Sequence, residues 1–158
     1  MESVLFTKDE CSIILNGIEN NEEYSLLNID DRKYEEWLIV DKSILDMVLN
    51  KLKRFGITSI KEGRILKYDK GCFFKKHVDT WEKYPHRYKT IIVQLSNGDS
   101  YEGGNMMYGD VILGKEIGNT VMFEGTLPHS MGEITSGIRY AFVIWLERND
   151  FGINKTLL

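Results

Sequence analysis

The chain contains 158 residues, carries a formal net charge of −4, and is 42% hydrophobic and 28% charged. This length allows one sizeable core but not two ordinary domains, and only two prolines are present to build a linker. Residues 1–9 are too acidic for a signal peptide, no long apolar run follows, and Cys11 and Cys72 fit neither a disulfide framework nor a CxxC zinc site. We therefore expect one domain in a reducing, cytoplasmic compartment, with no membrane partner.

Two helices and one strand are predicted in residues 1–56. Thr7 and Glu10 have the spacing of a capping box, which predicts a helix over residues 8–18. Residues 34–40 are rich in aromatic and β-branched side chains and predict a strand. Asp41 or Ser43 can cap a second helix, whose apolar positions recur at helical spacing until Gly56 ends it. This segment is therefore expected to be a helical support.

The remainder, residues 57–158, has the texture of a β protein. Short strands are predicted at 59–68, 73–78, 89–95, 105–108, 119–123, 130–134 and 138–147. Turn residues separate them at 69–71, 97–99, 103–104 and 135–137. Many short strands at even spacing indicate a sandwich or closed barrel rather than a parallel sheet. The predicted fold is mainly β with N-terminal helices (α+β), around a jelly-roll-like core.

Charge is distributed unevenly along the chain. Residues 51–89 contain twelve Lys and Arg against four acidic residues, whereas residues 1–50 contain four against twelve. A basic stretch of this kind is most often a solvated rim. The alternative is a surface that attracts an anionic ligand, such as an acidic peptide or a nucleic acid.

The chemistry of the chain is concentrated at His77-Val78-Asp79. Side chains two residues apart leave the same face of an extended strand, so the imidazole and the carboxylate are expected side by side. Such a pair supplies two of the three ligands of the 2-His-1-carboxylate arrangement that binds non-haem Fe(II) and leaves coordination positions open. An HxD pair alone is weak evidence, because it also arises by chance.

His129 and Arg139 complete the predicted site. His129 is the candidate third ligand, and a three-residue turn at 135–137 would place it opposite Val143. Arg139 would then share a face with His129, roughly 13 Å away at the rise of a strand. That distance suits a dicarboxylate that reaches from the metal to the guanidinium. Each of these side chains taken singly is more often structural than functional, so the hypothesis depends on their joint order.

The charges of such a site balance. Fe(II) with Asp79 leaves one positive charge, Arg139 adds another, and a dicarboxylate of charge −2 neutralises both. Arg139 could hold the distal carboxylate with two hydrogen bonds. Tyr68 and Thr90 are candidates to donate hydrogen bonds from their hydroxyl groups to the same carboxylate. The aromatic and basic loop of residues 81–88 is a candidate substrate rim through Trp81, His86 and Arg87, with a packed surface loop as the alternative.

Several spaced motifs together resemble the catalytic core of the prolyl 4-hydroxylase-type 2-oxoglutarate and Fe(II)-dependent dioxygenases. They are Tyr68-Asp69-Lys70-Gly71, His77-Val78-Asp79, Arg87 with Thr90, Tyr101-Glu102-Gly103-Gly104, residues 118–123, Pro128-His129, Gly137-Ile138-Arg139 and Trp145. The resemblance covers about half of the chain. It implies a double-stranded β-helix fold, iron ligands at His77, Asp79 and His129, and 2-oxoglutarate held by Arg139.

The resemblance also implies a reaction: hydroxylation of a substrate C–H bond with O₂, releasing succinate and CO₂, with ascorbate as a further reductant. The leading substrate is a peptidyl proline. Because many prolyl hydroxylases carry lysine where this chain has Arg139, a free amino acid, another small molecule or a modified nucleotide are alternatives. The partner is thus expected to be a peptide, a protein or a small molecule, with nucleic acid less favoured. A different class is a non-catalytic metal-binding jelly-roll module.

Overall fold

The protein is built on one long, curled antiparallel sheet. The computed structural model describes residues 1–152. Its main sheet contains β1 (Glu2–Val4), β2 (Tyr24–Ile29), β3 (Arg32–Ile39), β4 (Gly63–Tyr68), β5 (Phe73–His77), β6 (Lys89–Gln94), β8 (Met106–Tyr108), β9 (Val111–Ile112), β10 (Asn119–Glu124), β11 (His129–Met131) and β13 (Arg139–Leu146). The order is β1-β10-β6-β13-β4-β3-β5-β11-β8-β9, with β2 paired to β3. A second sheet pairs β7 (Tyr101–Gly103) with β12 (Ile134–Gly137).

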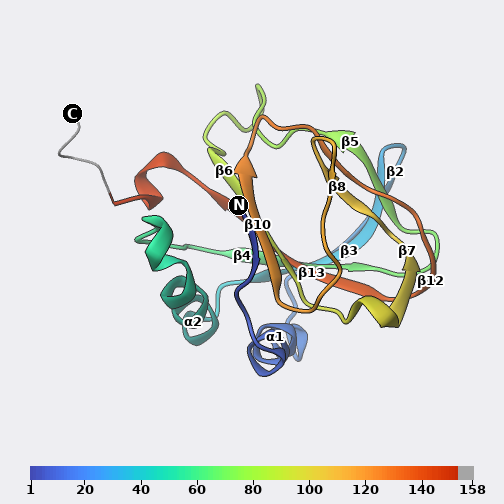
Figure 1. Ribbon diagram of the computed structural model, residues 1–158, viewed down its shortest axis with the longest axis horizontal. Coiled ribbons are helices and arrows are strands. Elements are labelled where there is room, and N and C mark those ends of the chain that lie inside the picture. Colours follow the sequence, from blue (N-terminus) through green and yellow to red (C-terminus); the bar gives the residue numbers. More distant parts are fainter. Residues whose placement is uncertain (153–158) are drawn as a thin grey trace.

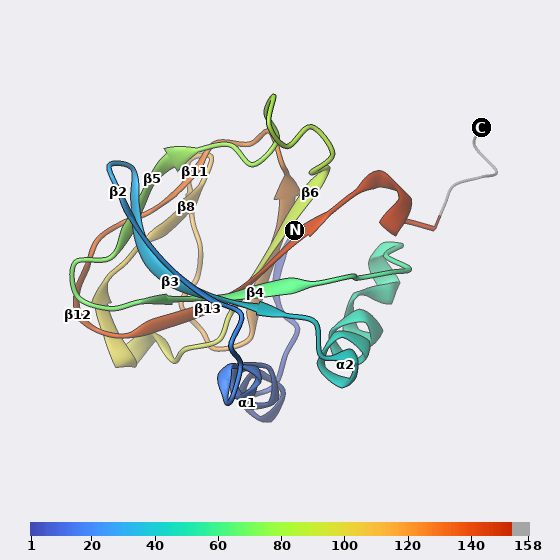
Figure 2. The same ribbon diagram turned by 180° about the vertical axis from the view of Figure 1, so that it is seen from behind.

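Two helices lie together on the outside of the bend. They are α1 (Lys8–Leu15) and α2 (Lys42–Leu52), and Figures 1 and 2 show them side by side beneath β4 and β13. The predicted capping box is confirmed, because Thr7 and Glu10 each accept a hydrogen bond from the other's backbone N–H. Asp41 caps α2, and Gly56, with a left-handed φ of +83°, ends the 3₁₀ turn that follows this helix. Short 3₁₀ turns occupy Asn16–Ile18, Lys53–Phe55, Gly98–Ser100 and Arg148–Asp150.

The expectation that residues 1–56 form a helical support with one strand is wrong in part, because three strands lie among them. Of these, β3 was predicted, but β1 and β2 were not. Every residue of β2 except Leu27 is exposed, so its sequence carries no alternation of buried and exposed positions. β1 is three residues long and pairs with β10, which is distant in sequence, and the Glu2 side chain accepts hydrogen bonds from Tyr108, Gly114 and Asn119. Neither strand has a local signal.

The predicted hairpin between His129 and Arg139 is also wrong. Residues 134–137 form β12 and pair with β7 instead of turning directly into β13. His129 lies opposite His77 and Tyr108, while Val143 lies opposite Arg64 and Ile92. Gly137 does have the expected left-handed φ, at +76°. The pairing partners are set by contacts distant in sequence, which turn chemistry alone does not specify.

The bend of the sheet separates two buried clusters that share the same strands. On β13, Phe142 and Ile144 point toward the helices, whereas Ala141 and Val143 point into the curl of the sheet. This is the period-two alternation of a strand that is covered on both faces. The helix-side cluster also contains Ile14, Ile39, Val48, Leu52, Ile65, Ile91 and Val93. The fold is therefore mainly β, with a curled sheet whose outer face is sealed by two helices and whose inner face encloses a second core.

None of the helices in the described part of the chain is long and apolar enough to cross a membrane.

Candidate active site

Three potential metal ligands meet inside the curl of the sheet. Ligand atoms of His77, Asp79 and His129 all lie within 4.8 Å of one another. The two histidines are brought together by the pairing of β5 with β11, in which they stand directly opposite each other. The sequence could not show this pairing, although it singled out all three residues that meet here.

Asp79 reaches this group from a bend and not from a strand. β5 ends at His77, so the expectation that His77 and Asp79 share a strand face is wrong. Instead, the backbone N–H groups of Asp79 and Thr80 both donate to the carbonyl of Gly125, each at 2.9 Å. The carboxylate is 5% exposed and accepts a hydrogen bond of 2.6 Å from the Thr90 hydroxyl. The bend thus places a buried carboxylate beside the paired histidines.

The histidine rings are oriented by backbone carbonyl groups. His77 Nδ1 lies 2.7 Å from the carbonyl oxygen of Lys75, and His129 Nδ1 lies 2.9 Å from that of Leu127. A carbonyl oxygen only accepts, so Nδ1 carries the proton in both rings and Nε2 has a free lone pair. The Nε2 atoms lie 3.6 and 3.2 Å from the two carboxylate oxygens of Asp79. This tautomer is the one that a metal ligand requires.

The protonation states agree with this orientation. Burial, together with the neighbouring His129, lowers the pKa of His77 to about 4, so this ring is neutral at pH 7. Burial acts to raise the pKa of Asp79, but the neighbouring His129 and the hydrogen bond from the Thr90 hydroxyl outweigh it and lower that pKa. Two imidazoles and an ionised carboxylate fit the donor set of non-haem Fe(II).

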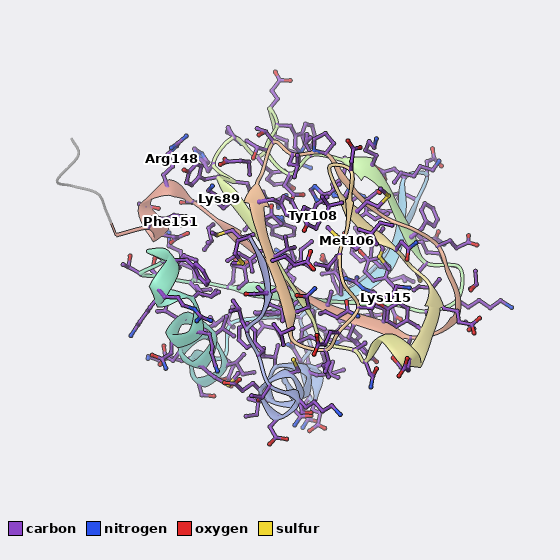
Figure 3. The ribbon with its side chains drawn as sticks, viewed as in Figure 1. Lys89, Met106, Tyr108, Lys115, Arg148 and Phe151 are labelled. Atoms are coloured by element: carbon purple, nitrogen blue, oxygen red, sulfur yellow. The ribbon has the colours of Figure 1, made fainter. Side chains whose placement is uncertain are left out.

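Aromatic rings hold the histidines in place. Phe74 stacks on His77 with ring centroids 3.6 Å apart and planes 11° apart. Phe123 packs against His129 with centroids 4.8 Å apart, and Tyr108 of β8 stacks on Phe123 in turn. Figure 3 shows Tyr108 among the side chains that fill the inside of the curl. The contacts of Phe123 with His129 and Tyr108 join separate strands, so no local sequence signal predicts them.

Arg139 is buried at the other end of the inner core. It is 2% exposed, and its Nε–H donates to the side-chain carbonyl of Gln94 at 3.0 Å. Among residues 1–152, its Nη2 has no hydrogen-bond partner. A buried guanidinium nitrogen without an acceptor is costly in the absence of a ligand, so this atom fits a carboxylate bound inside the protein.

The other two predicted co-substrate residues are Tyr68 and Thr90, and both line a cavity inside the curl of the sheet. Tyr68 lies directly across from Arg139 in the pairing of β4 with β13, and the Arg139 Cζ is 5.7 Å from its ring centroid. Burial raises the pKa of Tyr68, so its hydroxyl remains a proton donor. Thr90 contacts Asp79, which places its hydroxyl at the end of the cavity where the histidines lie.

A narrow cavity of about 50 Å³ joins Tyr68 and Thr90 to the three potential metal ligands. Its walls are Tyr34, Leu66, Tyr68, Phe74, His77, Asp79, Thr90, Ile92, Met106, His129, Ser130, Met131, Val143 and Trp145. Trp145 therefore faces inward, as its strand parity with Arg139 predicts. Cys72 is buried and donates to Asp69, in agreement with a structural role.

A wider cleft of about 670 Å³ leads from His77 and Asp79 to the surface. Trp81 and Arg87 line it, and the Arg87 guanidinium lies between the rings of Tyr84 and Trp145, at 3.8 and 3.9 Å from their centroids. His86 lies on two neighbouring clefts that contain neither His77 nor Asp79. Two of the three predicted substrate-rim residues thus lie beside the metal-ligand cluster, and His86 does not.

Comparison with protein families gives one match, the 2OG-Fe(II) oxygenase superfamily, over residues 63–147. A PKHD-type hydroxylase of Pseudomonas putida strain W619 is 31% identical over 91 residues, which cover 51% of this chain and 40% of that protein. The chain thus spans about two fifths of the length of the curated relatives that it matches.

Solved structures of the same fold include two prolyl hydroxylases. The viral collagen prolyl hydroxylase of Paramecium Bursaria Chlorella virus-1, in complex with 2OG, has a TM-score of 0.73 at 16% identity, covering 92% of this chain and 93% of that one. A Trichoplax adhaerens prolyl hydroxylase, in complex with a peptide fragment of hypoxia inducible factor, has a TM-score of 0.68 at 16% identity, covering 95% and 84%. At this identity the likeness concerns the fold alone.

Proposed function

The chain belongs to the 2OG-Fe(II) oxygenase superfamily, and we propose that it is of the prolyl 4-hydroxylase type and hydroxylates a substrate C–H bond with Fe(II), 2-oxoglutarate and O₂. The balanced reaction converts 2-oxoglutarate, O₂ and R–H into succinate, CO₂ and R–OH. We further propose that residues 57–158, of which 153–158 lie outside the described residues, form a double-stranded β-helix and that the chain acts as one domain.

One observation carries this proposal. A single inner cavity is lined by His77, Asp79, His129 and Tyr68. Tyr68 lies directly across from Arg139, whose buried Nη2 has no hydrogen-bond partner among residues 1–152. A metal site alone does not explain the buried guanidinium, and a structural arginine would be expected to have its donors satisfied. A metal-chelating dicarboxylate accounts for both features.

In this proposal the side chains divide into two groups. His77, Asp79 and His129 hold the metal from one side, and Fe(II), when bound, supplies the activation of O₂. Arg139 binds the distal carboxylate of 2-oxoglutarate, and the protonated Tyr68 hydroxyl donates to it. Thr90 fixes Asp79 through its 2.6 Å hydrogen bond and borders the space for the co-substrate.

The charges support the same assignment. Asp79 offsets one charge of the metal, and the remaining positive charge together with Arg139 matches a ligand of charge −2. A co-substrate without a distal carboxylate would leave Arg139 buried and uncompensated. The site is therefore suited to a dicarboxylic 2-oxo acid.

We propose a peptidyl proline as the leading substrate. The cleft beside His77 and Asp79 is long and open, and it contains Trp81 and the aromatic-flanked Arg87, which suit an apolar ring and a peptide carbonyl. A free amino acid, another small molecule or a modified nucleotide would use the same cleft. A non-catalytic metal-binding module is the alternative of a different class. Ascorbate as a reductant and a cytoplasmic location belong to the proposal.

Substrate-stimulated succinate release tests this function. The protein, loaded anaerobically with Fe(II) and 2-oxoglutarate, is exposed to O₂ with proline peptides, free amino acids or nucleotides. We expect a slow basal release that a proline peptide increases. If only amino acids or nucleotides stimulate succinate release, the proposal of a peptide substrate is wrong and that compound class takes its place. No succinate under any condition, with iron bound, would favour the non-catalytic module.

A further inference from the structure

Gln94 is a buried polar residue that the proposed reaction does not use. It lies on β6, is 1% exposed, and its side chain is inside the curl of the sheet. Its carbonyl oxygen accepts the Nε–H of Arg139 at 3.0 Å, and its amide nitrogen donates to the hydroxyl of Tyr101 at 2.8 Å. Because the amide can accept and donate at once, it links the two side chains in one chain of hydrogen bonds.

Tyr101 is itself fixed by contacts on β7. It is 5% exposed, and the Lys115 ammonium lies 4.9 Å from its ring centroid while donating to the Gly103 carbonyl at 2.8 Å. Lys115 is labelled in Figure 3. The second sheet, β7 with β12, therefore anchors the far end of the hydrogen-bond chain that leads to Arg139. The orientation of the Gln94 amide is therefore set by its hydrogen bond to Tyr101 as well as by packing.

The consequence for Arg139 is geometric. A guanidinium can rotate about its long side chain, but fixing Nε defines the plane of the group and the direction of both Nη atoms. With Nε bound to Gln94, Nη2 is left buried and without a partner in the described part of the chain. The donor is thus oriented before a ligand arrives, which reduces the entropy lost on binding.

The choice of an amide is also an electrostatic one. A glutamate at this position would accept the same hydrogen bond but would form a buried ion pair with Arg139. That pair would cancel the positive charge that a distal carboxylate needs. A glutamine orients the guanidinium and leaves its charge uncompensated.

We propose that Gln94, anchored by Tyr101, is a positioning residue that orients Arg139 for the distal carboxylate of the 2-oxo acid and keeps its charge available. This inference rests on the proposed function of the site. It assigns no contact between Gln94 and the co-substrate, so the effect of Gln94 passes through Arg139.

Equilibrium binding under anaerobic conditions tests the inference. Two probes are titrated into the Fe(II)-loaded protein: 2-oxoglutarate, and 2-oxovalerate, which has the same chain length but no distal carboxylate. Both are followed by the visible metal-to-ligand charge-transfer band. Gln94→Met is similar in length but lacks the amide. We expect it to lower the affinity for 2-oxoglutarate about 10- to 100-fold and to leave the affinity for 2-oxovalerate unchanged within about 2-fold.

Gln94→Glu separates orientation from a structural need for the hydrogen bond. It retains an acceptor for Arg139 Nε, so a merely structural role would be rescued. We expect instead that the affinity for 2-oxoglutarate stays lower by about 10-fold or more, while the thermal stability remains near that of the native protein. Tyr101→Phe should lower the affinity for 2-oxoglutarate only a few-fold, because the hydrogen bond from Arg139 Nε to Gln94 remains.

Thr120→Val is the matched control. Thr120 is fully buried on the neighbouring strand β10, and its hydroxyl donates to the Gly118 carbonyl at 3.1 Å without contacting Arg139. We expect both probes to bind as in the native protein. Equal loss of both probes in Gln94→Met, or full 2-oxoglutarate affinity in Gln94→Glu, would overturn the inference. If the native protein itself shows no band with 2-oxoglutarate, the proposed function fails instead.

Discussion

The two buried faces of the sheet differ in the side chains that they require. On the helix side, β13 presents Phe142 and Ile144 to apolar partners from α1 and α2, and the cluster there is made of hydrophobic side chains. On the inner side, the same strand presents Arg139 and Val143, and buried polar groups such as Gln94 and His129 lie nearby. Any side chains of suitable size could fill the first face, whereas the second requires particular groups in particular orientations.

This difference shows how one sheet serves stability and chemistry at once. The inner polar groups are costly to bury and are held by specific hydrogen bonds, such as those of Asp79 with Thr90 and of Arg139 with Gln94. The helix-side core supplies apolar burial that offsets such costs. Substitutions on the inner face should therefore affect ligand binding and turnover, and those on the helix side should affect stability.

Asp79→Ala should have the largest effect on the inner face. Removing the carboxylate takes away the charged ligand of the proposed metal site, so substrate-stimulated turnover should fall on the order of 10³-fold or more, about 4 kcal/mol. Iron affinity, measured by equilibrium dialysis, should fall with it. Retention of native iron affinity would mean that the metal, if bound, lies elsewhere.

Phe142→Ala should have the largest effect on the helix side. Phe142 is fully buried, so its truncation should lower the free energy of unfolding by about 3–5 kcal/mol. Denaturant titration measures this loss. In the fraction that stays folded, the affinity for iron should be native. A large change in iron affinity with little loss of stability would contradict the division between the two faces.

Thr90→Val should have a smaller effect, confined to the inner face. The valine keeps the shape but loses the hydrogen bond to Asp79, one of the contacts that lower the pKa of that carboxyl group. We expect iron affinity at pH 7 to fall about 10-fold, as for other groups that support a ligand. Serine at position 90 retains the hydroxyl and serves as the control, and it should bind iron nearly as well as threonine. Native affinity in the valine variant would show that Thr90 does not support the ligand.

Thr7→Ala should have the smallest effect and should concern stability alone. It removes the capping box of α1, which should lower the free energy of unfolding by about 1 kcal/mol. Thermal unfolding measures the loss, and the anaerobic affinity for 2-oxoglutarate should not change. A change in that affinity would mean that α1 communicates with the inner cavity.

The parts of this architecture that the sequence could predict are those with local signals. The capping box at Thr7, the cap at Asp41 and the strand β13 all follow from neighbouring residues. The set of His77, Asp79, His129 and Arg139 follows from chemistry and spacing together. Their partners do not, because the pairing of β5 with β11 and the contact of Gln94 with Arg139 join residues about 50 positions apart.

The errors have the same origin. The segment 135–137 has turn residues and was expected to join two paired strands, but its pairing with β7 competes with that hairpin. Asp79 was expected on a strand, but its N–H donates to Gly125, which lies far along the chain. In both cases a contact distant in sequence decided the conformation.

The central claim is that one cavity binds a metal at His77, Asp79 and His129 and a dicarboxylate at Arg139. Anaerobic titration of the native protein and of Arg139→Ala, first with Fe(II) and then with 2-oxoglutarate, tests it most directly. We predict that both proteins bind iron with similar affinity, that the native protein then develops the charge-transfer band, and that Arg139→Ala requires about 10- to 100-fold more 2-oxoglutarate to do so. Absence of the band in the native protein, or an equal loss of iron and 2-oxoglutarate binding in the variant, would contradict the two-part site.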